Sequence, residues 1–355
     1  MNRTQEVDRL RVAYQHELAL GTGRFHAPKR TTCPWCGSSR LRTRLRTVDL
    51  LQHKPGTFVI DQCRDCSHSF QNPQLTPEGL DFYYRDFYDG LGAALAERAF
   101  SGSGKRYLAS ARALLPFAAP RRWLDVGTGH GHFPQTAGTV HPTTVFDGLD
   151  LSEGVEEAKR QGRIAEAHHG LLTDLAPKLE GRYEAVSMFH YLEHTTDPRA
   201  ELTAAGTVLT PGGHLIIEVP DPECVSSAIL GRYWMPYFQP QHLHLIPLAN
   251  LSRELESLGY TVVAVERHEP HIPFDLTGAA VLALVHALPP ADAPWHAAPP
   301  GGLQRKARKA LFWSAVPLLA GVYGAEQLLA PLLRRTRLSN AYRIVARHGT
   351  ALRPL

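Results

Sequence analysis

The sequence has few cysteines and methionines, five and three among 355 residues. It also opens without the basic stretch, apolar run and small-residue cleavage site of a secretory leader, and its first residues are strongly charged instead. These absences exclude a disulfide-stabilised secreted scaffold, so we expect a protein of the reducing cytoplasm. Hydrophobic residues make up 43% of the chain, enough for one large domain and a small accessory module.

Uninterrupted apolar runs of membrane-spanning length are also lacking. A transmembrane helix needs ~20 consecutive apolar residues, whereas the longest candidate, Leu311 to Leu333, contains Pro317, Glu326 and Pro331. Its apolar residues recur with a helical period, so we expect two amphipathic helices that pack on the domain. The alternative is a peripheral membrane contact through residues 305–337, which basic residues flank, and a true span is disfavoured.

Charge is unevenly distributed, although the formal net charge is only +4. Residues 1–85 carry 13 basic and 8 acidic side chains, residues 86–302 carry 15 and 25, and residues 303–355 carry 10 and 1. An acidic body is thus flanked by two basic ends. Such ends can meet nucleic acid, anionic lipid or an acidic substrate, and charge alone does not choose among them.

Four of the five cysteines form two C-x-x-C pairs, which we interpret as a structural zinc ribbon over residues 31–70. Two such pairs supply the four thiolates of a closed tetrahedral Zn²⁺ site, and a redox role is the less favoured alternative. The stretches Leu41 to Val48 and Phe58 to Ile60 have the pattern of hairpin strands. The fifth cysteine, Cys224, stands alone and is expected to be a small apolar side chain. The predicted ligands are Cys33, Cys36, Cys63 and Cys66.

Residues 71–104 predict an aromatic helical linker or lid. Thr76, Pro77 and Glu78 are typical of an N-cap, a first helical position and a first turn. Aromatic residues follow at Phe82, Tyr83, Tyr84, Phe87 and Tyr88.

Strands and helices alternate from residue 105 to 268, which predicts an α/β fold with a parallel sheet covered by helices on both faces. Strands are expected at 122–127, 143–149, 164–168, 184–189, 213–219 and 260–267, and helices at 105–117, 152–161, 198–209 and 248–258. Ligands of such sheets bind beyond the carboxyl ends of the strands. A helical insertion over 269–339 and a final strand within 340–355 complete the chain, which begins with a helical or flexible extension over 1–30.

A glycine-rich turn lies at one of these strand ends. Asp125 is followed by Gly127, Gly129 and Gly131, a D-x-G-x-G-x-G spacing that differs from the dinucleotide fingerprint G-x-G-x-x-G. Glycine lets the backbone bend sharply and approach a ligand. Asp150 ends the next strand, where a carboxylate can accept two ribose hydroxyls; the alternative is an N-cap for the following helix.

The turn and later segments resemble the class I S-adenosylmethionine (SAM) methyltransferases, in particular the small-molecule branch that includes ubiquinone-pathway O-methyltransferases. The resemblance covers residues 105–268 and rests on 148–159, 183–198, 208–220 and 241–260 besides the turn. Residues 31–88 resemble the zinc ribbon of some bacterial members, including sugar C-methyltransferases, although the long C-terminal lobe of the sugar enzymes is absent. The implied fold is a Rossmann-like methyltransferase sheet.

The resemblance also implies a cofactor site. Asp125, Gly127, Thr128, Gly129 and Gly131 would hold the methionine part of SAM. Asp150 would bind its ribose, and Leu151 and Asp174 would lie near the adenine. Asp174 comes several residues later than the usual family position.

Methyl transfer requires an aligned acceptor and a group that removes its proton. The candidate bases are His190, Glu193 and His194, at the end of the fourth strand, with Tyr191 lining the pocket. Histidine suits this role because its ordinary pKa lies near neutrality. His242, with His244 on the same face, is a further candidate to reach the acceptor, whereas a metal site there is disfavoured.

The leading hypothesis is therefore a SAM-dependent methyltransferase that acts on a small molecule such as a natural-product, glycan or lipid-linked intermediate. Tyr84 and Tyr88 would close over an amphipathic acceptor. Neither an N-P-P-Y motif nor a Pro-Cys nucleophile, both typical of nucleobase methylation, occurs. One alternative is an RNA methyltransferase whose ribbon binds phosphates through Arg40, Arg42, Arg44 and Arg46. The other is a non-catalytic SAM-binding scaffold.

Overall fold

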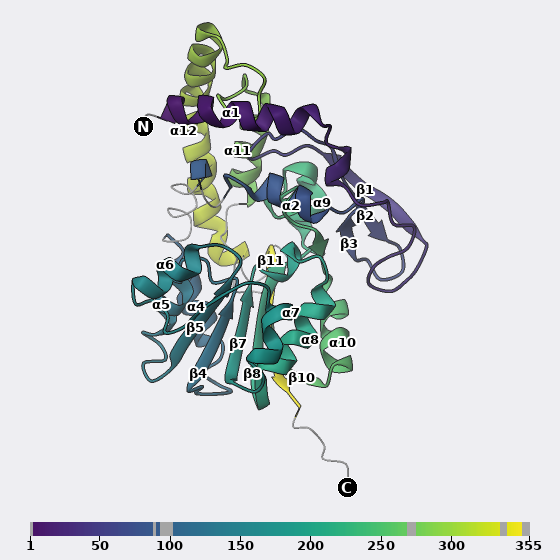
Figure 1. Ribbon diagram of the computed structural model, residues 1–355, viewed down its shortest axis with the longest axis vertical. Helices are drawn as coiled ribbons and strands as arrows, with labels where there is room; N and C mark the ends of the chain where they lie inside the picture. Colours follow the sequence, from purple (N-terminus) through teal and green to yellow (C-terminus); the bar gives the residue numbers. More distant parts are fainter. Residues whose placement is uncertain (1–2, 88–89, 93–101, 268–274, 334–338, 350–355) are drawn as a thin grey trace. The chain divides into compact units, whose positions relative to one another are not determined.

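A computed structural model describes residues 3–87, 90–92, 102–267, 275–333 and 339–349, which form two compact units (Figure 1). The first unit comprises Met1–Phe87, Val225–Leu243 and Pro273–Leu332, and the second comprises Tyr88–Cys224, His244–Ile272 and Leu333–Leu355. The chain therefore passes from the second unit into the first and back, which nothing in the alternation of strands and helices indicated.

The first unit contains the predicted hairpin. Strands β1 (Leu41–Thr47) and β2 (Phe58–Cys63) pair antiparallel, and β3 (Ser69–Gln71) pairs antiparallel with β2. The register places Leu41 opposite Cys63. The hairpin thereby carries the two cysteine pairs, one before β1 and one after β2, to the same end of the sheet.

Helix α2 (Pro77–Tyr84) begins where the sequence predicted it to begin. The Thr76 hydroxyl accepts a hydrogen bond from the Gly79 amide at 3.1 Å, and Pro77 occupies the first turn. Phe82 and Tyr83 of α2 face inward and form the core of the unit with α1 (Arg3–Ala19), whereas Tyr84 is half-buried and its hydroxyl donates to the Gln241 carbonyl oxygen at 3.2 Å. Tyr88 lies outside the described residues. The buried members of this core are Tyr14, Phe25, Phe58, Leu75, Phe82, Tyr83, Ala293 and Trp295.

Lys54 is buried inside this aromatic core, with 2% of its surface exposed. Its ammonium group donates hydrogen bonds to the carbonyl oxygens of Phe82 at 2.6 Å and Arg85 at 2.5 Å, at the C-terminal end of α2. The same nitrogen lies 5.1 to 5.4 Å from the ring centroids of Tyr14, Phe82 and Trp295. A buried cation is costly unless it is paired, and here helix carbonyls and aromatic faces provide the compensation.

The two helices predicted within residues 303–337 are one helix, so that prediction is wrong. Helix α12 (Gly302–Leu333) runs unbroken through Pro317, and α11 (Asp275–Ala287) precedes it. Proline removes the hydrogen bond to the carbonyl four residues earlier, that of Trp313. Trp313 and Pro317 are exposed, so water can satisfy this carbonyl.

The second unit is built on a sheet of seven strands in the order β6-β5-β4-β7-β8-β11-β10. Its five strands from β6 to β8 are parallel, as predicted. The strand β11 is antiparallel to both of its neighbours, β8 and β10, so the sheet is mixed rather than wholly parallel. The strands are β4 (Arg122–Val126), β5 (Val145–Asp150), β6 (Ala167–His169), β7 (Tyr183–Phe189), β8 (Leu209–Pro220), β10 (Tyr260–Glu266) and β11 (Ala341–His348).

Helices cover both faces of this sheet (Figure 1). The chain winds from β4 towards β6 in one direction and from β7 towards β8 in the other, and right-handed crossovers then place the connecting helices on opposite faces. One face carries α4 (Gly104–Arg112), α5 (His132–Ala137) and α6 (Gly154–Arg160); the other carries α7 (Leu172–Leu175), α8 (Pro198–Val208) and α10 (Leu248–Ser257). The short elements α9 (Val225–Ile229) and β9 (His244–Leu245) lie between β8 and α10 in the sequence.

We expect Lys54→Met to lower the free energy of unfolding by about 2–4 kcal/mol, because two buried carbonyl groups lose their donor. Urea denaturation followed by circular dichroism measures this loss. The matched control is Lys309→Met, at an exposed lysine of the same unit, for which we expect less than about 0.5 kcal/mol. Equal effects of the two substitutions would show that the buried ammonium stabilises nothing.

Candidate functional site

The candidate site lies in the second unit, at the carboxyl edge of three neighbouring parallel strands, β4, β5 and β7. The glycine-rich turn connects β4 to α5, Asp150 is the last residue of β5, and residues 190–194 follow β7. Parallel pairing carries these three strand ends to one edge of the sheet. The glycine-rich turn, Asp150 and most predicted catalytic residues are therefore gathered in one place, whereas the predicted cofactor residue Asp174 lies on α7, after β6.

The turn is held in a conformation that favours glycine at three positions. Gly127, Gly129 and Gly131 have φ angles of +76°, +51° and +73°, which L-residues with a side chain rarely adopt. The amide of Gly127 donates to the carbonyl oxygen of Leu149 at 2.8 Å and thereby attaches the turn to β5.

The three glycines face different surroundings. A Cβ atom on Gly127 would lie 2.9 Å from the ring of Tyr191, and one on Gly131 would lie 2.9 Å from the Ala158 Cβ of α6. A Cβ on Gly129 would meet nothing within 4 Å. Gly127 and Gly131 are thus needed for close packing inside the domain, whereas Gly129 borders open space in which a ligand can lie against the backbone.

Asp150 is bonded back to this turn. Its Oδ2 atom accepts a hydrogen bond from the Gly129 amide at 2.7 Å, and its Oδ1 atom accepts from the amide and the hydroxyl of Ser152, both at 2.8 Å. The alternative role as an N-cap is wrong, because α6 begins at Gly154 and Glu153 occupies the N-cap position. The half-buried carboxylate instead faces the edge of the sheet beside Gly129.

Asp125 lies beneath the turn with 3% of its surface exposed. The Ser187 hydroxyl donates to Asp125 Oδ1 at 2.6 Å and accepts in turn from the indole nitrogen of Trp123 at 2.9 Å. Burial raises the pKa of Asp125 to about 7, against a smaller lowering by the hydrogen bond from Ser187. Near neutral pH this carboxyl group is therefore only partly ionised, and a cationic group brought beside it would favour its ionised form.

The remaining predicted cofactor residues surround this pair. Leu151 directly follows Asp150, and 62% of its surface is exposed, unusual for leucine at the end of a core strand. Thr128 is 8% exposed within the turn. Asp174 is exposed on α7, which follows β6, the neighbour of β5 in the sheet.

His190 is held between two carboxylates. Its Nδ1 atom lies 3.0 Å from Glu193 Oε1, and its Nε2 atom lies 3.1 Å from Glu218 Oε1. Burial alone lowers the pKa of His190, but the hydrogen bonds to Glu193 and Glu218 outweigh it, so the pKa is raised. The backbone of His190 has a φ of +53°, an uncommon conformation for histidine. This surrounding favours an imidazolium ion, which has no lone pair with which to accept a proton.

A chain of buried charges continues from His190 across the sheet. Glu218 Oε2 accepts from the Arg343 guanidinium at 2.8 and 3.1 Å, and Arg343 also donates to Glu266 at 2.6 Å. Burial raises the pKa of Glu218, but Arg343 and His190 outweigh it and hold that pKa well below its ordinary value. Neither Glu218 nor Arg343 was predicted from the sequence. The available signal was a glutamate within the apolar run from Leu215 to Val219, since a buried carboxylate requires a partner.

Tyr191 covers the glycine-rich turn. Its ring packs on Gly127, and its hydroxyl donates to Glu201 Oε2 at 3.1 Å. Burial raises the pKa of Glu201 to about 7, partly opposed by this hydrogen bond. Tyr191 thus packs over the turn, and its hydroxyl group is directed to Glu201 of α8.

Glu193 and His194 form a short 3₁₀ turn after β7, over Leu192–His194. Glu193 is 1% exposed, and a carboxylate oxygen of it lies within 4.8 Å of a ring nitrogen of His194, which is half-buried. His242 belongs to the first unit, where its Nδ1 atom lies 2.7 Å from the Pro236 carbonyl oxygen. His244 is buried in β9 of the second unit. The two histidines that the sequence placed on one face therefore belong to different units.

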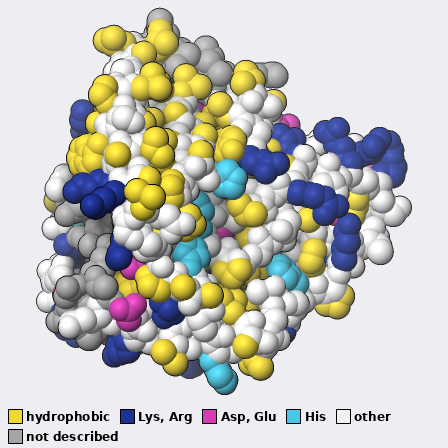
Figure 2. Space-filling view, turned by 90° about the horizontal axis from the view of Figure 1, so that it is seen from above, with side chains coloured by type: hydrophobic (Ala, Val, Ile, Leu, Met, Phe, Trp, Pro, Cys, Tyr) yellow, Lys and Arg dark blue, Asp and Glu magenta, His cyan; other side chains and the backbone are white. Residues whose placement is uncertain are grey.

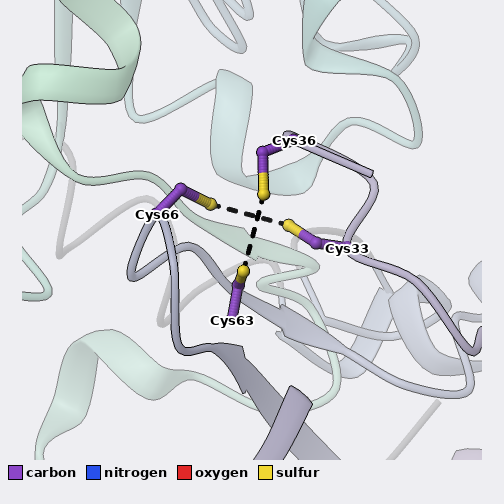
Figure 3. A group of neighbouring side chains, drawn as sticks. All are labelled: Cys33, Cys36, Cys63 and Cys66. Atoms are coloured by element: carbon purple, nitrogen blue, oxygen red, sulfur yellow. Dashed lines mark hydrogen bonds between the residues drawn. The ribbon is translucent and has the colours of Figure 1, made fainter. Parts of the chain in front are cut away.

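The four paired cysteines of the first unit converge on one point (Figure 3). The Sγ atoms of Cys33 and Cys66 are 3.7 Å apart, and those of Cys36 and Cys63 are 3.5 Å apart. These separations are too long for a disulfide bond of ~2.0 Å. They are close to the ~3.8 Å edge of a tetrahedron with Zn–S bonds of ~2.3 Å. The arrangement can therefore hold a tetrahedral metal ion.

Both C-x-x-C turns have the same backbone arrangement. The Trp35 amide donates to Cys33 Sγ at 3.4 Å, and the Asp65 amide donates to Cys63 Sγ at 3.4 Å. Hydrogen bonds to sulfur favour the thiolate, which is the form that binds metal. The donor set thus fits Zn²⁺ in charge as well as in geometry.

The arginines proposed for RNA binding are partly engaged within the first unit. Arg40 pairs with Asp65 at 2.7 Å, Arg42 donates to Gln62 at 2.6 Å, and Arg44 hydrogen-bonds the Tyr237 hydroxyl. An arginine held by a protein acceptor has fewer of its five N–H donors left for a phosphate. These contacts favour a solvated hairpin face over a surface that binds a phosphate backbone.

The second unit also matches a known family. Residues 100–265 match the family model described as "Methyltransferase domain". The matched residues are thus similar to a methyltransferase domain. The match spans β4 to β8 and both strand-end aspartates, Asp125 and Asp150. The Rossmann-like fold and the resemblance to class I SAM-dependent methyltransferases are thereby confirmed.

Curated relatives of the methyltransferase domain carry the name ubiquinone biosynthesis O-methyltransferase. The protein from Alkalilimnicola ehrlichii is 30% identical over 131 residues, which is 35% of this chain and 52% of the relative. That from Xanthomonas campestris pv. campestris is 27% identical over 192 residues, 49% of this chain and 76% of the relative. Several matches span only about half of the relatives' length. A solved SAM-dependent methyltransferase from Archaeoglobus fulgidus aligns at 21% identity with a TM-score of 0.46, over 72% of this chain and 99% of that one.

We expect the purified protein to contain about one zinc ion per chain, measured by plasma emission spectroscopy. Cys63→Ser should lose the zinc and destabilise the first unit, because the free energy of zinc binding contributes to the folding of the segment that carries the ligands. Cys224→Ser, which alters the cysteine outside the cluster, is the control and should keep the zinc. Zinc retained in full by Cys63→Ser, or absent from the unaltered protein, would contradict the assignment.

Proposed function

We propose that the protein is a SAM-dependent methyltransferase that acts on a small-molecule acceptor. The observation that carries the proposal is the hydrogen bond between Asp150 Oδ2 and the Gly129 amide, at 2.7 Å. It joins a carboxylate to a glycine turn that borders open space, at the strand edge where α/β sheets bind ligands.

The residues present fit SAM in chemistry as well as position. An ionised carboxylate has about four acceptor sites, and Asp150 uses three of them for Gly129 and Ser152. We infer that the Ser152 hydroxyl occupies the position of one ribose hydroxyl and gives way when the nucleoside binds. The exposed Leu151 supplies an apolar surface for the adenine ring, and Asp125 supplies the counter-charge for the ammonium of the methionine part.

When bound, SAM would supply an electrophilic methyl group, and the protein must align the acceptor and take its proton. His190 serves this chemistry indirectly: as an imidazolium between Glu193 and Glu218 it fixes the position of the loop after β7. We assign the proton-accepting role to His194, which is half-buried beside Glu193 on the same turn. Tyr191, packed on Gly127, excludes water from the turn.

The names of the relatives and the charge of residues 86–302 both bear on the class of molecule that accepts the methyl group. Several relatives are named O-methyltransferases of ubiquinone biosynthesis, and we propose a hydroxyl group on a natural-product, glycan or lipid-linked intermediate as the acceptor here. Residues 86–302 carry 25 acidic and 15 basic side chains, which would repel a polyphosphate backbone. Both observations favour a small molecule over RNA.

We further propose that the cysteine cluster holds a structural Zn²⁺ ion. Four thiolate ligands complete the tetrahedron, so no coordination position is left for a substrate or a water molecule. The ion would connect the two turns at the end of the β1–β2 hairpin. Its contribution is to the folding of the first unit and not to the chemistry.

Isothermal titration calorimetry tests the cofactor site. We expect Asp150→Ala to weaken SAM binding at least about tenfold, because hydrogen bonds to the ribose are lost. Glu153→Ala is the control, since that side chain is 86% exposed three residues away. Asp125→Asn should also weaken SAM binding, without loss of thermal stability, because asparagine can still accept the Ser187 bond while the buried ionisable group disappears.

The outcomes separate the candidate functions. Unchanged SAM affinity in Asp150→Ala would contradict the proposed site. Tight SAM binding without transfer to any member of a panel of hydroxylated acceptors would favour the non-catalytic scaffold. Turnover that survives in His194→Ala with an unaltered pH profile would remove His194 as the base while leaving the cofactor site intact.

A further inference from the structure

Helix α12 presents large apolar side chains to solvent. Leu303 and Leu328 are each 82% exposed, Leu318 is 71% exposed and Trp313 is 61% exposed. At 3.6 residues per turn the three leucines fall on one side of the helix, with Trp313 beside them. No charged residue occurs from Ala310 to Ala325. An apolar face of this length on a solvent-exposed helix marks an interaction surface.

Positive charge borders this face at one end. The first turns of α12 carry Arg305, Lys306, Arg308 and Lys309, of which all but Arg308 are exposed. The one acidic residue of α12, Glu326, is 4% exposed and lies on the opposite side of the helix. Its carboxylate accepts hydrogen bonds from the amides of Leu276 and Thr277 at the start of α11. The apolar face therefore has basic neighbours and no exposed acidic one on α12.

Contacts on the opposite side of α12 determine which face of this helix is exposed. Glu326 caps α11, Ala330 is 2% exposed, and the Arg308 guanidinium donates to the Pro289 carbonyl at 2.6 Å. The segment before α12 is in turn attached to α1, since Arg11 donates to Ala293 and His296 and pairs with Asp292. Within the first unit, the apolar face is thus directed away from the packed core. Figure 2 shows hydrophobic side chains gathered in one broad area of the surface, with basic side chains near it.

We propose that α12 binds the surface of a membrane that contains anionic lipid. The exposed cations of its first turns would meet lipid phosphates, Trp313 would lie at the boundary of headgroups and acyl chains, and the leucines would enter the apolar layer. The helix would lie in the plane of the interface: none of the helices in the described part of the chain is long and apolar enough to cross a bilayer.

A second copy of the chain is a poorer partner for this face. Residues 303–355 contain 10 basic residues and the single acidic residue Glu326, with basic residues both before and after the uncharged stretch. Two α12 helices paired in parallel would therefore bring their basic first turns together. Glu326, the one acidic residue that α12 of an antiparallel partner could offer to those turns, is already engaged with α11. Anionic lipid supplies the missing negative charge. The inference does not depend on methyl transfer.

Vesicle co-sedimentation of the full chain tests the proposal. We expect binding to vesicles of phosphatidylglycerol and phosphatidylcholine, and much weaker binding to phosphatidylcholine alone. Replacing three exposed cations, Arg305→Gln, Lys306→Gln and Lys309→Gln, should weaken binding to the mixed vesicles roughly a hundredfold. Trp313→Ala with Leu318→Ala should also weaken it, with little effect on circular dichroism because both side chains are exposed.

The matched control removes three other exposed cations of the first unit, through Arg9→Gln, Arg42→Gln and Arg46→Gln. If the two triple variants lost vesicle binding to the same extent, the effect would come from net charge alone, and the proposal would be overturned. Failure of the unaltered chain to bind either vesicle would also overturn it. Concentration-dependent dimers in sedimentation velocity that Leu318→Ala with Leu328→Ala abolishes would assign the face to a second copy instead.

Discussion

The hydrogen bond from the Gly129 amide to Asp150 is the interaction on which the candidate site depends. It holds the end of β5 against the turn that follows β4, and it requires a backbone with positive φ at successive glycines. A side chain at Gly127 or Gly131 would collide with Tyr191 or with α6. The turn, the end of β5 and α6 are therefore interdependent, and Gly129 leaves one side of the turn open.

Buried charge is the second constraint on this edge of the sheet. Asp125, Glu193 and Glu218 are each at most 3% exposed, which is costly unless partners compensate for the lost water. Ser187 compensates Asp125, while His190 and Arg343 compensate Glu218. The strained backbone of His190 is supported by the same network. Of these three carboxylates, only Asp125 has no cationic group among its hydrogen-bond partners in the described part of the chain. This agrees with a site in which a bound ligand supplies the positive charge.

The sequence predicted the parts of the molecule that local signals specify. Thr76 and Pro77 define a helix start, the C-x-x-C turns and the hairpin between them are short-range patterns, and the parallel sheet covered by helices follows from the alternation of strands and helices. It could not reveal Ser187, which meets Asp125 through strand pairing, or Arg343, which reaches Glu218 from the last strand. The unbroken helix through Pro317 was missed for another reason: proline's cost was offset by the contacts of Glu326 and Ala330 beyond it.

The central claim is that Asp150 and the glycine-rich turn form a SAM site, and a crystal structure with S-adenosylhomocysteine tests it most directly. We predict both ribose hydroxyls within hydrogen-bond distance of the Asp150 carboxylate, the Ser152 hydroxyl displaced, and the adenine against Leu151. A nucleoside bound elsewhere, or bound at this edge with its ribose turned away from Asp150, would contradict the account.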